Sequence, residues 1–62
     1  MTQKELAYFE DAIGHEENII KILSKSMESI DDEKIIDFIE NEKGLHQSRK
    51  EKLISYLGGF NE

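Results

Sequence analysis

The chain has 62 residues and a formal net charge of −6, with 37% hydrophobic residues and neither proline nor cysteine. This length allows one domain at most, and the lack of cysteine excludes a disulfide framework and thiolate metal sites. The acidic charge argues against nucleic acids and anionic membrane surfaces as partners. No apolar run approaches a membrane span and no signal-peptide pattern is present, so we expect a soluble cytoplasmic protein.

A first helix is predicted over residues 3–28. Thr2 and Glu5 have the spacing of a capping box, which marks the start of a helix. Apolar residues then recur at helical spacing in two neighbouring stripes: Leu6, Phe9, Ile13, Ile20, Leu23, Met27 and Ile30 in one, and Tyr8, Ala12, Ile19 and Ile22 in the other. Glu16 occupies the gap in the first stripe. Together the stripes predict an apolar face wider than a coiled-coil seam.

The acidic segment that follows predicts a turn over residues 29–31. Either Ser29 or Asp31 can cap the next helix, because both side chains accept hydrogen bonds from free backbone N–H groups. The second helix is predicted over residues 32–57. Its apolar stripe consists of Ile35, Phe38, Ile39, Leu45, Leu53, Tyr56 and Leu57. Glu42 and His46 interrupt this stripe near its centre.

The C-terminal tail is predicted over residues 58–62. Gly58 and Gly59 are expected to end the second helix, as a glycine just past a helix end does, with Phe60 folding back as the hydrophobic contact. The last two residues, Asn61 and Glu62, are expected to fray.

Two helices of similar length joined by a short turn predict an all-α, antiparallel hairpin as the single domain of residues 1–62. A turn centred near residues 30 and 31 places Glu16 opposite residues 45 and 46. Charge pairing agrees with this register, since Lys21 and Lys25 fall near Asp37 and Glu40, and Arg49, Lys50 and Lys52 fall near Glu10, Asp11 and Glu17. One hairpin cannot bury two wide faces, so we expect a homodimer that forms a four-helix bundle.

The interrupting polar residues have two interpretations. Glu42 and His46 lie one turn apart on one face and Glu16 approaches from the other helix, so the three can ligate a metal ion. A dimer then holds four glutamates and two histidines, the ligand inventory of ferritin-like di-iron and di-manganese bundles. The usual Glu-x-x-His spacing is absent, however. The preferred interpretation is a polar cluster of the same residues with Arg49, which sets register and dimer geometry through charge-assisted hydrogen bonds.

The sequence contains no nucleophile arrangement, phosphate-binding loop or zinc-finger spacing. We therefore expect a non-enzymatic structural or protein-interaction hairpin, and no small-molecule substrate is indicated. A regulatory hairpin that offers its apolar face to a helix of another protein is a further possibility. Gly14 and Gly44 fall in the middle of the predicted helices and on their outer faces, where each costs roughly 1 kcal/mol relative to alanine.

The segment from Lys4 to Glu16, KELAYFEDAIGHE, resembles the opening of small clostridial proteins related to the spore coat protein F family. Those proteins often read Lys-Glu-Leu, an aromatic residue, Glu-Asp-Ala, an aliphatic and a small residue, then His-Glu. The similarity continues in outline to residue 57, with an acidic turn, His46 near the middle of a helix and an aromatic-leucine end. It implies a ferritin-like helical hairpin associated with the spore, with other spore-coat proteins as partners and no established reaction.

Overall fold

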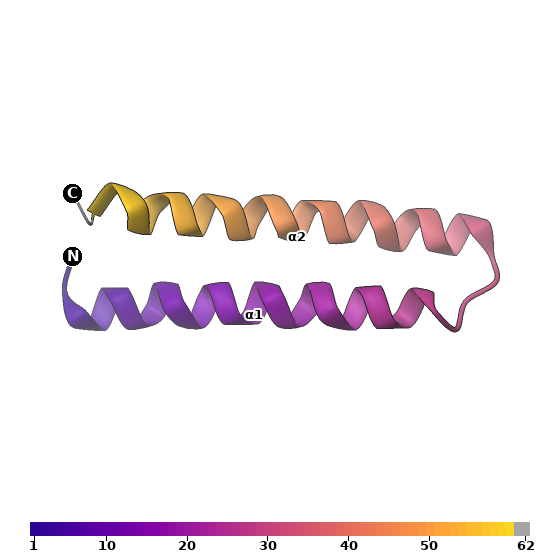
Figure 1. The fold of residues 1–62 in the computed structure, drawn as a ribbon, viewed down its shortest axis with the longest axis horizontal. Helices are drawn as coiled ribbons and strands as arrows, with labels where there is room; N and C mark the ends of the chain where they lie inside the picture. The colour runs from indigo at the N-terminus through magenta and orange to yellow at the C-terminus, as the bar shows by residue number, and fades with distance from the viewer. Residues whose placement is uncertain (61–62) are drawn as a thin grey trace.

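The computed structural model of the chain describes the backbone of residues 1–60 and the side chains of residues 1–58. Two α-helices, α1 (Gln3–Met27) and α2 (Glu33–Phe60), run antiparallel along each other, and the two ends of the chain lie at the same end of the molecule (Figure 1). The molecule measures 45 × 15 × 11 Å. The expected all-α antiparallel hairpin is therefore confirmed, as a single layer of two helices.

The start of α1 is stabilised by the capping box that the sequence predicts. The Glu5 backbone N–H donates to Thr2 Oγ1 at 3.1 Å, and the Thr2 backbone N–H donates to the Glu5 carboxylate at 2.9 Å. Hydrogen bonding to the Thr2 backbone, and then to its side chain, lowers the pKa of the Glu5 carboxyl below its usual value. These bonds satisfy two of the N–H groups that a helix start leaves without partners.

The cap of α2 differs from the prediction, because Asp32 rather than Ser29 or Asp31 fills that position. The Asp32 carboxylate accepts hydrogen bonds from the backbone N–H groups of Lys34 at 2.9 Å and Ile35 at 3.4 Å. Ser29 belongs to the end of α1 instead, since its hydroxyl donates to the Ser26 carbonyl at 3.4 Å. The connection accordingly covers residues 28–32 and is two residues longer than the predicted turn.

The C-terminal end of α2 also differs from the prediction, because the helix continues to Phe60 rather than ending at Leu57. Gly58 keeps a negative φ. Glycine permits the left-handed conformation of a helix end without requiring it, and no proline follows to stop the helix. The expected contact of the Phe60 side chain and the expected fraying of Asn61 and Glu62 lie outside the described residues.

The two helices bury very little against each other. Among the described side chains Ile39 alone is buried, at 9% exposure. At the end away from the turn, the rings of Phe9 and Tyr56 stack with their centroids 5.9 Å apart. Gly14 and Gly44 have open space where a Cβ would lie, as expected for the outer face. The hairpin thus holds its shape through helix packing along a narrow seam rather than around an enclosed core.

Candidate functional site

Glu16 of α1 and His46 of α2 meet near the middle of the seam. His46 Nδ1 and Glu16 Oε2 are 2.5 Å apart, and the two side chains are only 15% and 16% exposed. A carboxylate only accepts hydrogen bonds, so the ring nitrogen is the donor. The predicted register, which places Glu16 opposite residues 45 and 46, is confirmed by this contact. It gives the hairpin a polar bond between the helices where the apolar stripes are interrupted.

Glu42 and Arg49 do not join this pair within one chain. Glu42 is half-buried and Arg49 is exposed, and within the part of the chain that the structure describes neither side chain forms a hydrogen bond or an ion pair. The directions of the side chains around α2 explain why Glu42 does not reach the pair. Four residues along a helix leave an offset of about 40°, so when His46 points at α1, Glu42 points to one side of the seam. Arg49 points to the same side.

The three predicted metal ligands are therefore only partly brought together. Residues 1–60 hold no group of three histidine, aspartate or glutamate side chains placed to bind one ion. Glu16 and His46 converge, whereas Glu42 lies beside them without contact. One chain alone thus supplies an incomplete ligand set, and a metal centre requires the second copy that the sequence predicts.

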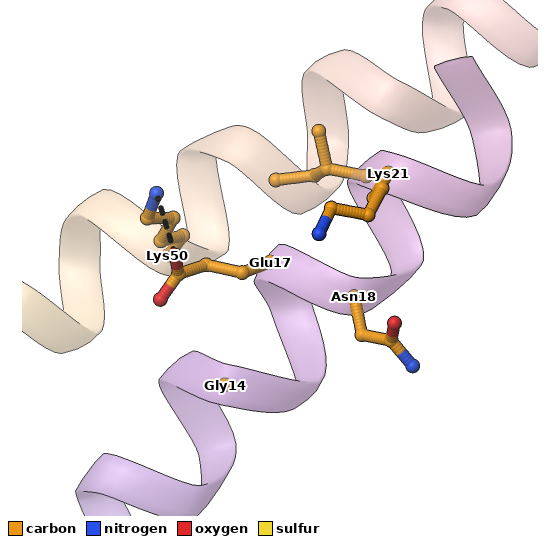
Figure 2. A pocket seen from close by; sticks show the side chains of 6 residues that line it. Gly14, Glu17, Asn18, Lys21 and Lys50 are labelled. Atoms are coloured by element: carbon orange, nitrogen blue, oxygen red, sulfur yellow. Dashed lines mark ion pairs between the residues drawn. The ribbon is translucent and has the colours of Figure 1, made fainter. Parts of the chain in front are cut away.

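One side of the hairpin is mainly polar, although Leu6 and Ile54 are also exposed there, at 39% and 47%. A shallow groove crosses this side, and Figure 2 shows Glu17 and Lys50 reaching toward each other across it, with Asn18 pointing away from α2. Lys50 Nζ lies 3.8 Å from Glu17 Oε2, which confirms one of the expected charge pairs. The other expected pairs are not formed among the described residues. An exposed pair of this kind contributes at most about 1 kcal/mol, so the groove offers no built binding site.

The opposite side, here called the open face, carries exposed large apolar side chains. They are Tyr8, Ile22, Phe38, Leu45 and Tyr56, each between 52% and 65% exposed. On α1, Tyr8 is nine residues from Glu17, about two and a half turns, and therefore points away from the polar side. On α2, Phe38, Leu45 and Tyr56 share one stripe, because seven and eleven residues are close to whole numbers of turns.

A second shallow groove lies on the open face and reaches the polar pair. It is lined by Phe9, Glu16, Arg49, Lys52, Leu53 and Tyr56. Its lining is mainly apolar, and Arg49 and Lys52 are the two basic residues among those that line it. The open face therefore combines exposed apolar residues with charged ones near its middle, next to the Glu16–His46 contact.

The exposed area of the chain is large for its mass. The hairpin exposes 5095 Å², whereas a compact monomer of 7.2 kDa is expected to expose about 4,100 Å². The excess of about 1,000 Å² over this compact reference reflects the extended shape of the hairpin, in which two helices lie in one layer of 45 × 15 × 11 Å. The open face is thus a candidate interaction surface by the chemistry of its exposed side chains.

The apolar stripe predicted for the second helix contains Phe38, Leu45 and Tyr56 together with Ile39, and the sequence does not separate the residues of the seam from those of the open face. The signal for the open face in the sequence is the width of the apolar arc, which exceeds what a single neighbouring helix can cover.

Comparisons of the chain with protein-family models, curated proteins and solved structures gave no match. Within the described residues, neither helix has the length and apolar character needed to cross a membrane. The open face and the Glu16–His46 pair are therefore the two features of the molecule that bear on its function.

Proposed function

We propose that this protein is a structural or protein-interaction hairpin that works as a homodimer, with two open faces packed together into a four-helix bundle. The observation that carries the proposal is the open face, whose exposed aromatic and aliphatic residues continue on both helices. Several exposed large apolar side chains on one side of a small protein mark a candidate association site. A two-helix unit of 62 residues also gains from association, since so small a core stabilises a fold only marginally.

The cellular setting is proposed from the resemblance of residues 4–16 to proteins related to the spore coat protein F family. On this basis the bundle is a non-enzymatic component associated with the spore, and its further partners are other spore-coat proteins. Its acidic net charge of −6 favours partners with basic surfaces over nucleic acids.

A matched pair of substitutions tests the homodimer. Leu45 on the open face and Ile54 on the other side of α2 are similarly exposed, at 52% and 47%. Leu45→Glu is expected to convert the dimer to a monomer in analytical ultracentrifugation, because it buries a charge at the interface. Ile54→Glu is expected to leave the dimer unchanged. Equal effects of the two substitutions, or none from Leu45→Glu, would contradict the proposal.

The alternative function is a carboxylate-rich di-metal protein with iron or manganese held at the dimer centre. The Glu16–His46 contact favours it, since two of the three expected ligands already lie together on neighbouring helices. Elemental analysis of protein purified without added metal tests this alternative. It requires about one metal ion per chain, lost in His46→Ala, whereas the interaction hairpin is expected to be free of metal and to keep its fold in chelator.

A further inference from the structure

We infer that the two copies pack with their turns at opposite ends, around a two-fold axis that crosses the helices at the level of the Glu16–His46 contact. This inference rests on the proposed homodimer and specifies its arrangement. In a two-fold dimer each contact occurs twice, so that residue i of one copy meets residue j of the other and j meets i. The surface of each helix must therefore match its own reversed copy.

The surface of α2 meets this condition through its charges. Glu42 and Arg49 are seven residues apart, about two turns, and so lie on one stripe. They flank Leu45 and His46 symmetrically. When α2 packs against a reversed copy of itself, Glu42 meets the partner's Arg49 and Arg49 meets the partner's Glu42. Both side chains lack a partner within the described residues of one chain, and this arrangement gives each of them one.

The surface of α1 meets the same condition through the sizes of its side chains. Its open-face stripe contains Tyr8, Ala12, His15, Ile19 and Ile22, and this stripe is nearly symmetric about residues 15 and 16. Reversing the helix places the small Ala12 opposite the partner's Ile19, and Tyr8 near the partner's Ile22. Alternation of small and large residues across facing positions fills a bundle without voids.

The two centres of symmetry lie at the same level of the hairpin. The centre on α1 lies between His15 and Glu16, and the centre on α2 lies between Leu45 and His46. The bond between Glu16 and His46 fixes these positions side by side. One two-fold axis can therefore pass through the centres of symmetry of both helices. The packing within a single hairpin does not by itself require these two centres to lie at the same level.

The other two-fold arrangement, with both turns at one end, is less favourable. It packs α2 against the partner's α1 rather than against the partner's α2. Glu42 and Arg49 then face a stripe of Ala12, His15, Ile19 and Ile22, in which His15 is the one ionisable side chain. Charges that enter an interface without partners are strongly destabilising.

Mixing two charge-reversed variants tests the inferred pairs. In Glu42→Arg every pair becomes Arg with Arg, and in Arg49→Glu every pair becomes Glu with Glu, so each variant alone is expected to dimerise about tenfold more weakly than wild type. An equal mixture forms heterodimers in which both pairs are again opposite in charge. The mixture is therefore expected to recover wild-type dimerisation in ultracentrifugation, and failure to recover would overturn the inference.

A distance measurement tests the same arrangement without altering the interface. The natural chain has no cysteine, so Ser29→Cys in the exposed turn carries a single spin label. The label lies about 13 residues from the axis, so pulsed electron resonance is expected to give about 40 Å between copies. A separation of about 20 Å or less would place the turns at one end and contradict the inference.

The two experiments also separate this inference from the proposal on which it rests. A wild-type chain that sediments as a monomer overturns the homodimer and the inferred axis together. A wild-type dimer that shows the short distance and no recovery on mixing keeps the homodimer and overturns the axis. A variant that loses its helical circular dichroism does not block the test, because the spin-label distance uses the wild-type interface.

Discussion

At the scale of single residues, the Glu16–His46 contact is the feature that most distinguishes this hairpin from a plain apolar one. Each side chain is about 85% removed from solvent and bonded to the other. A nearly buried polar pair adds little net stability compared with apolar residues of similar size, but it penalises any register that separates the partners. The pair therefore determines which residues of α1 and α2 face each other, and it contributes little to the net free energy of unfolding.

This role leads to a prediction with three variants. Glu16→Leu is expected to lower the free energy of unfolding by about 1–3 kcal/mol, because His46 loses the acceptor for its ring N–H. Adding His46→Leu is expected to recover most of that loss, since both polar groups are then replaced together. Urea unfolding at a fixed protein concentration measures both effects. A double variant as unstable as Glu16→Leu alone would show that the pair has no such coupled role.

At the scale of the helices, the caps define where each element begins. The α1 cap follows from a local sequence pattern, Thr2 with Glu5, and needs no knowledge of the rest of the chain. The α2 cap depends on how α1 ends. Ser29 satisfies the Ser26 carbonyl of α1, which leaves Asp32 to accept the first N–H groups of α2.

The assignment of this cap is testable with two neighbouring residues of the same type. Asp32→Ala is expected to destabilise the protein by about 1 kcal/mol, because the N–H groups of Lys34 and Ile35 lose their acceptor. Asp31→Ala is the matched control, and thermal unfolding should leave it within a few tenths of a kcal/mol of wild type. A larger loss of stability in Asp31→Ala than in Asp32→Ala would show that Asp31 is the cap.

Much of the hairpin can be predicted from the sequence because its signals are local or periodic. The stripes give two helices, and the short acidic segment gives the turn and hence the meeting of Glu16 and His46. Besides the α2 cap, two features could not be predicted. Gly58 allows a left-handed helix end without requiring one, so α2 continues. A wide apolar arc does not say which part faces α2, so Glu42 appeared central although it lies beside the seam.

At the scale of the whole molecule, the apolar surface has two parts. The seam packs α1 against α2, and the open face is the surface that we propose binds a second copy. The seam holds α1 and α2 in register, but among the described side chains Ile39 alone is buried, and it keeps 9% of its exposure. Most of the remaining large apolar side chains stay exposed or half-buried, which leaves the single hairpin with little to offset the entropy of folding. Association would complete the core, and folding and dimerisation would then be linked.

The most direct test of this account is the mass of the wild-type protein in solution, measured by sedimentation equilibrium across the micromolar range together with helical circular dichroism. We expect twice the chain mass of 7.2 kDa wherever the protein is helical, and loss of helix in step with dissociation on dilution. A helical species with the mass of a single chain throughout this range would show that the open face does not bind a second copy.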